Sequence, residues 1–76
     1  MEIESFIEKF AEQFEETDTS TFNADTDFRA LDEWSSYTAL AVMAMVCEEY
    51  EVMLSADQMR SVSTIGQLFE LTKSLL

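Results

Sequence analysis

Apolar side chains recur at helical spacing in the first fifteen residues of the chain. They stand three or four positions apart, on one stripe of an α-helix, at Ile3, Phe6, Ile7, Phe10 and Phe14. Glutamates fill the other side, which is typical of a solvated helix face. The pattern therefore predicts an amphipathic N-terminal helix whose phenylalanines enter a core.

From Glu16 to Glu33 the chain is rich in turn-forming residues and poor in helix formers, which predicts a long loop. Loops of this length are uncommon in compact domains unless they are functional or anchored. Phe22, Phe28 and Leu31 are the apolar side chains within it, and we expect them to be the anchors.

Fourteen consecutive residues, 34–47, carry no charge. Helical spacing divides this run and the turn after it into two stripes on opposite sides of one helix. One stripe contains Ala39, Val42, Met43, Val46 and Tyr50, and the other contains Tyr37, Ala41, Ala44 and Glu48. A helix that is apolar nearly all round is either buried on every side or leaves one apolar face outside for a partner. In so small a domain we favour the second arrangement.

Two capping boxes follow an apolar connector at residues 52–54. Ser55 with Gln58 opens a short helix, and Thr64 with Gln67 opens the last one. The last helix has helically spaced positions at Ile65, Leu68, Phe69, Thr72 and Leu75, with Gly66 in its first turn. No strand alternation is evident. We predict an all-α fold, a small antiparallel four-helix bundle of three main helices and one short helix, in a single domain over residues 1–76.

The charge balance restricts the partners. Sixteen acids against four bases give a net charge of −12, so nucleic acids and anionic lipid surfaces would be repelled. Residues 1–33 hold eleven of the acids and two of the bases. The N-terminus is acidic, unlike a signal peptide, and no apolar run is long enough to span a bilayer. A single cysteine fits a reducing cytosol. We therefore expect a soluble, cytoplasmic protein without membrane insertion, and we expect it to be a monomer.

The chain contains no histidine, which removes the commonest general base and metal ligand. Glu48 and Glu49 point about 100° apart on a helix and are expected at the surface. Cys47 has no basic neighbour in sequence to stabilise a thiolate, so we expect an inert thiol at the rim of the core. Residues 23–27 resemble a calcium loop, but Phe28 replaces its glycine and Trp34 its last glutamate. We therefore predict neither an enzyme nor a specific metal site.

The serine pair Ser35-Ser36 lies between the long loop and the uncharged helix. One interpretation is ordinary N-capping, in which a serine oxygen accepts a hydrogen bond from a first-turn N–H. The other is a modified serine, because a hydroxyl at a helix N-terminus is exposed and the positive end of the helix dipole favours an attached phosphate. The residues by themselves leave both open.

The segment from Phe28 to Leu71 resembles the acyl carrier proteins, or phosphopantetheine-binding carrier domains. Several features match in order: Phe28-x-x-Leu31-x-x-Trp34, a serine two residues later, an apolar helix that closes on Glu48-Glu49-Tyr50, the connector to Leu54, and Thr64-Ile65 followed by Leu68. The resemblance implies that Ser36 carries 4′-phosphopantetheine, transferred from coenzyme A by a phosphopantetheinyl transferase. Ser35 is the fallback site, because the spacing from Trp34 favours Ser36.

By the same resemblance the protein tethers an acyl or aminoacyl group as a thioester on the arm and presents it to acyl-loading and acyl-transferring enzymes. Those partners would dock on the outward stripe of Tyr37, Ala41, Ala44 and Glu48. Met43 and Met45 are adaptable side chains that suit a core able to shelter an acyl chain.

The site departs from the usual Asp-Ser-Leu of the family, since Ser35 replaces the acid and Tyr37 the aliphatic residue. These departures indicate a specialised carrier for a dedicated lipid, polyketide or aminoacyl pathway, rather than the general carrier of fatty acid synthesis. The alternative, from another class, is an unmodified acidic helical module. It would bind another protein through the apolar face of its second helix, with Ser36 merely capping that helix.

Overall fold

Four α-helices form the fold in the computed structural model, which describes residues 2–76. They are α1 (Ile3–Ala11), α2 (Ser36–Tyr50), α3 (Ala56–Arg60) and α4 (Ile65–Ser74). Two single-turn 3₁₀ helices, η1 (Thr19–Thr21) and η2 (Phe28–Ala30), interrupt the loop between α1 and α2. Within residues 2–76 no β-strand occurs, only an isolated antiparallel bridge between Asp27 and Thr64. The prediction of an all-α bundle with one short helix is confirmed.

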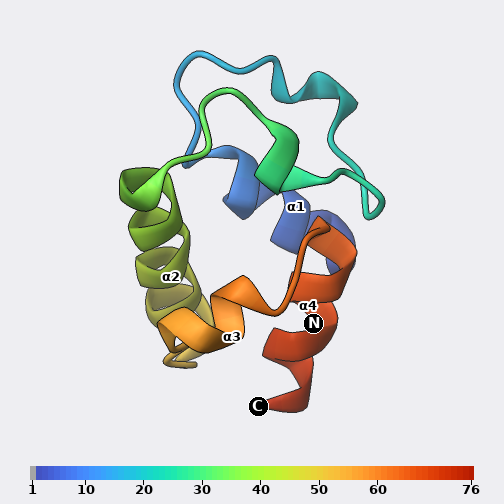
Figure 1. Cartoon of the computed structure of the whole chain (residues 1–76). Coiled ribbons are helices and arrows are strands. Elements are labelled where there is room, and N and C mark those ends of the chain that lie inside the picture. The colour runs from blue at the N-terminus through green and yellow to red at the C-terminus, as the bar shows by residue number, and fades with distance from the viewer. Residues whose placement is uncertain (1) are drawn as a thin grey trace.

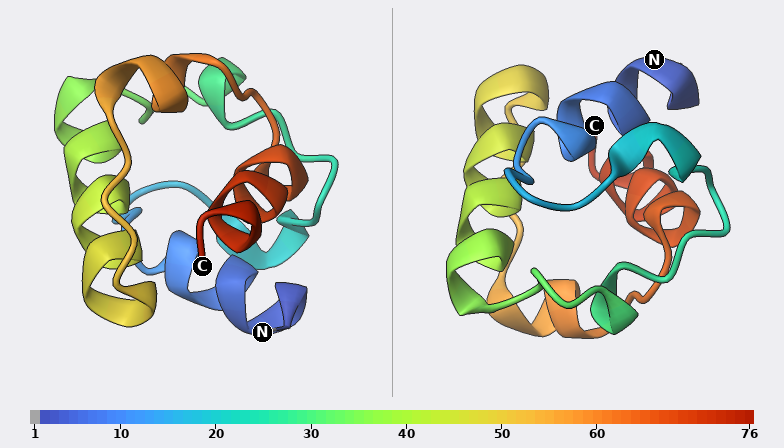
Figure 2. Two further views of the ribbon diagram at one scale, coloured as in Figure 1. Left: turned by 90° about the horizontal axis from the view of Figure 1, so that it is seen from below. Right: turned by 90° about the horizontal axis from the view of Figure 1, so that it is seen from above.

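The helices surround a single aromatic-rich core. α1 packs against α4 and α2, and Figure 1 shows α2 and α4 on opposite sides of the molecule with α3 between their lower parts. The views from below and above show the α1–α2 loop closing one end (Figure 2). The radius of gyration is 11.1 Å, close to the roughly 11 Å of a compact chain of this length. The largest fully buried side chains are Phe6, Phe10, Phe28, Ile65, Leu68, Val42, Val46 and Thr72.

Local signals in the sequence set the helix ends. Both capping boxes are present: Ser55 and Gln58 exchange hydrogen bonds at the start of α3, as do Thr64 and Gln67 at the start of α4. α2 ends at Tyr50, and its C-cap Glu51 adopts a left-handed backbone with φ of 58°. α1 stops at Ala11, short of the predicted fifteen residues, yet Phe14 beyond it is still buried.

The buried face of α2 is rotated from the predicted one. Thr38, Val42, Met45 and Val46 are its buried residues, whereas Ala39, Met43 and Tyr50 are only half-buried. The predicted stripe was therefore only partly right. A nearly uniform apolar sequence contains no polar position that fixes which side of the helix faces the core, so contacts from α1 and the loop decide it.

The long loop is anchored by aromatic rings, as predicted. Phe28 is fully buried, and Phe22 and Leu31 are half-buried against the core. The Trp34 ring lies 4.6 Å from that of Phe28, centroid to centroid, and is stacked at 6.4 Å on Phe10. Because Trp34 immediately precedes the serine pair, this packing fixes the chain where α2 begins.

Candidate functional site

The two serines at the start of α2 have different roles. Ser35 is the N-cap residue, and its Oγ accepts a hydrogen bond from the Thr38 N–H at 3.2 Å. Ser36 is the first residue of α2 and is exposed. Within the described residues its hydroxyl makes no hydrogen bond, so the capping interpretation applies to Ser35 and leaves the hydroxyl of Ser36 available.

Glu33 holds the chain before the serines through side-chain and backbone contacts. Its carboxylate accepts hydrogen bonds from the N–H groups of Glu15 (2.8 Å), Glu16 (3.1 Å) and Thr17 (2.9 Å), and from the Thr17 hydroxyl (2.6 Å). These bonds, with the Thr17 hydroxyl first, lower the pKa of Glu33 from 4.5 to about 2. Its carbonyl oxygen accepts a bond from the Thr38 hydroxyl at 2.9 Å. The end of the α1–α2 loop is thereby tied both to the beginning of the same loop, at residues 15–17, and to the first turn of α2.

A hollow of about 480 Å³ opens beside the serine pair, between α2 and α3. We call it the α2–α3 hollow; it is lined by Arg29, Trp34, Ser35, Ser36, Ala39, Leu40, Met43, Ala56, Met59 and Arg60. Most of this lining is apolar, and its polar groups are two hydroxyls and two guanidinium groups. The chemistry of this set fits phosphopantetheine, since a serine can be esterified, guanidinium groups bind phosphate, and apolar walls accommodate a flexible chain.

The predicted partner-binding residues on α2 differ in exposure. Tyr37, Ala44 and Glu48 are exposed, with Tyr37 80% accessible. Ala41 is half-buried, and with Ala44 and Glu48 it lines a hollow of about 380 Å³ that Lys9 of α1 borders on the other side. Ala41 is therefore turned more toward α1 than the predicted stripe required.

The outward face of α2 also contains side chains that the sequence analysis did not assign to it. Leu40 is 63% accessible, and Cys47 is exposed and unpaired with another cysteine. The prediction that Cys47 lies at the rim of the core is therefore wrong: it follows Val46 on the side of α2 that turns away from the core. Leu75, predicted on the core stripe of the last helix, is 42% accessible because α4 ends at Ser74.

Other candidate chemistry is dispersed over the surface. Glu48 and Glu49 are both exposed, and Glu49 pairs with Lys9 of α1 at 3.4 Å. Among residues 2–76 no three acidic or cysteine side chains are grouped so that they could hold a metal ion.

Two residues of the hollow, Arg29 and Arg60, were missed by sequence reasoning. The Arg29 Nε–H donates to the carbonyl of Val62 at 2.7 Å, and a terminal nitrogen donates to that of Met59 at 2.6 Å. These contacts join positions about thirty apart in the chain, and nothing in the local pattern predicts them. The only available signal was that the chain has just four bases.

Comparison with known proteins adds no relative. No protein-family model matches the chain, and neither does any curated protein or solved structure. In the part of the chain that the structure describes, no helix is both long and apolar enough to cross a membrane. Any functional assignment therefore depends on the residues and geometry given above.

Proposed function

We propose that this protein is an acyl carrier protein that bears 4′-phosphopantetheine on Ser36. The observation that supports it best is that the two serines have different environments. Ser35 caps α2, whereas the Ser36 hydroxyl is exposed and borders a largely apolar hollow. A residue needed only for capping would have its oxygen engaged with the helix, as Ser35 has.

The modification requires only an accessible hydroxyl from this chain. A bond forms between Ser36 Oγ and the phosphorus next to the pantetheine of coenzyme A, and the pyrophosphate bond breaks. Adenosine 3′,5′-bisphosphate leaves with the bonding electron pair, and the hydroxyl proton passes to a base of the phosphopantetheinyl transferase. When bound, the group supplies a terminal thiol that holds an acyl or aminoacyl cargo as a thioester.

The remaining residues position the arm and address the cargo. Glu33 and Trp34 fix the backbone before Ser36, and the walls of the α2–α3 hollow offer an apolar surface for the chain of the arm or cargo. Tyr37 and Leu40, both largely exposed beside Ser36, would contact the acyl-loading and acyl-transferring enzymes. Such a carrier would serve a fatty acid, polyketide or aminoacyl pathway in the cytoplasm.

Intact mass tests this proposal. The purified protein is incubated with coenzyme A, magnesium and a broad-specificity transferase, and we expect a gain of one phosphopantetheinyl group. Ser36→Ala should abolish the gain. Ser35→Ala is the matched control: it loses a helix cap, worth about 1 kcal/mol, but should still be modified. No gain in the wild type, or a full gain in Ser36→Ala, would contradict the assignment.

The second candidate is an unmodified protein-interaction module. The exposed apolar side chains Tyr37 and Leu40, accessible by 80% and 63%, favour it because they are neighbours near the start of α2, and exposed apolar patches often mark interaction sites. Pull-downs with modified and unmodified protein separate the two functions. Equal retention of partners by both forms supports the module, whereas retention of ligases or synthases only through the arm supports the carrier.

A further inference from the structure

The α2–α3 hollow has basic but no acidic side chains in its described lining, although the protein is strongly acidic. The chain has sixteen acids and four bases, yet two of those bases, Arg29 and Arg60, line this hollow. No Asp or Glu occurs among the described residues of its lining. A random sample of the charged residues would be mostly acidic, so this composition points to an anionic ligand.

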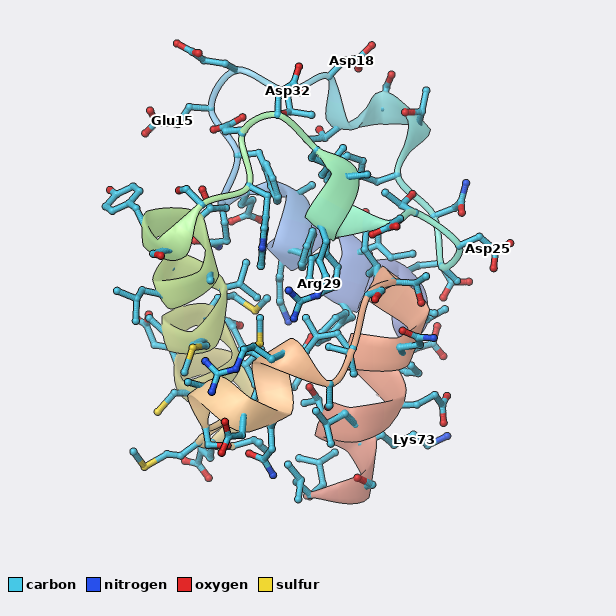
Figure 3. The ribbon with its side chains drawn as sticks, in the orientation of Figure 1. Glu15, Asp18, Asp25, Arg29, Asp32 and Lys73 are labelled. Atoms are coloured by element: carbon cyan, nitrogen blue, oxygen red, sulfur yellow. The ribbon has the colours of Figure 1, made fainter. Side chains whose placement is uncertain are left out.

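Arg29 is fixed in place but keeps its charge uncompensated by its own contacts. Its two hydrogen bonds go to the carbonyl oxygens of Met59 and Val62, which are neutral acceptors. Figure 3 shows the Arg29 side chain projecting from η2 toward the middle of the molecule, between α2 and α4. A guanidinium has five N–H donors, and these two bonds leave others for an anion.

Arg60 has an anionic partner that is easily displaced. Its terminal nitrogen pairs with Asp57, one turn earlier on α3, and the two side chains are 66% and 89% accessible. Exposed ion pairs of this kind contribute little to the free energy of unfolding, typically less than about 1 kcal/mol. A phosphate that contacts both arginines would compete well with Asp57.

We propose that Arg29 and Arg60 bind the phosphate of the phosphopantetheinyl group on Ser36. This inference rests on the proposed carrier function and adds to it a site that holds the first part of the arm along the α2–α3 hollow. Ser35 contributes to this site by being neutral, because a carboxylate at that position would place a negative charge on the same hollow. The form with a free thiol is sufficient for the test, since its phosphate is then the only added anion.

Thermal unfolding of the modified and unmodified forms tests the site. Modification should raise the wild-type midpoint by roughly 2–5 °C at low salt, as a charge-assisted contact in a domain of this size would. In Arg60→Gln the rise should fall by at least half. Lys73→Gln removes the same charge from α4, away from the hollow (Figure 3), and should leave the rise unchanged. High salt should suppress the rise in the wild type.

Two further variants separate anion binding from a structural role. Asp57→Asn removes the competitor of Arg60 and should increase the rise on modification, which a purely structural Arg60 would not produce. Arg29→Gln loses its bonds to Met59 and Val62, so both forms should be less stable, and only the difference between them is read. The Nε–H resonances of Arg29 and Arg60 should also shift on modification. This shift should be larger than the change that Lys73→Gln causes in the same two resonances.

These experiments distinguish a failure of the arginine site from a failure of the proposed carrier function. If Ser36 gains no mass, the carrier function fails and this site fails with it. If Ser36 is modified but Arg60→Gln and Lys73→Gln show the same rise as the wild type, the carrier function stands and the arginine site is wrong.

Discussion

The Glu33 carboxylate joins the two ends of the α1–α2 loop, and its lowered pKa makes the stabilisation measurable. Because folding lowers this pKa from 4.5 to about 2, its stabilising contribution is complete above pH 4.5 and is lost as the pH falls toward 2. Glu33→Gln should therefore lower the free energy of unfolding at neutral pH. The deficit relative to wild type should shrink across that acidic window. Urea unfolding at a series of pH values measures it.

Asp32→Asn is the control for Glu33→Gln, because Asp32 is an exposed neighbour. Asp32→Asn should lower the free energy of unfolding only slightly relative to wild type. If this deficit is as large as that of Glu33→Gln and shrinks over the same pH range, the role given to Glu33 is wrong. The sequence could not predict this role, because the donors lie at Glu15, Glu16 and Thr17, sixteen to eighteen positions away. By contrast, a serine at the start of α2 could be predicted from the local pattern, and the resemblance to carrier proteins selected Ser36 from the pair.

At the level of elements, the α1–α2 loop meets α4 at Gly66. The Gly66 N–H donates to the Ala24 carbonyl at 2.8 Å, and a Cβ at position 66 would lie 2.9 Å from that oxygen. Gly66→Ala gains helix propensity of up to about 1 kcal/mol, but the close contact must be relieved by moving backbone. We expect a net loss of about 1–3 kcal/mol in unfolding free energy by urea denaturation. Exposed Glu70→Ala on the same helix should change it by less than about 0.5 kcal/mol. A stabilised Gly66→Ala would show that the loop moves at no cost.

Gly66 also shows which features of the elements could be predicted. The sequence places this glycine in the first turn of a helix but gives no reason for it, whereas the contact with Ala24 gives a packing reason. Helix starts were predictable because capping boxes such as Ser55 with Gln58 are complete within four residues. The rotation of α2 was not, since Leu40 and Val42 are equally apolar in sequence and only packing exposes the one and buries the other.

At the scale of the whole molecule, most of the negative charge is separated from the proposed site. Eleven of the sixteen acids lie in residues 1–33, and Figure 3 shows Glu15, Asp18 and Asp32 gathered around the α1–α2 loop, away from α3. The α2–α3 hollow has no acid in its described lining. The sequence indicates the first half of this separation by counting charges, but the convergence of Arg29 and Arg60 requires the tertiary fold, because they come from η2 and α3.

Crowding of like charge around Glu33 should limit stability at low salt. Glu15 and Glu16 bind the Glu33 carboxylate through their backbone N–H groups, so replacing their side chains with Gln keeps those bonds and removes two nearby negative charges. The double variant should unfold a few degrees higher than wild type at low ionic strength, with the gain largely screened near 1 M salt. Thermal unfolding at several salt concentrations measures this. Glu48→Gln with Glu70→Gln removes equal charge from the second half of the chain and should give a smaller gain. Equal gains would mean that net charge, rather than its concentration around the loop, sets the stability.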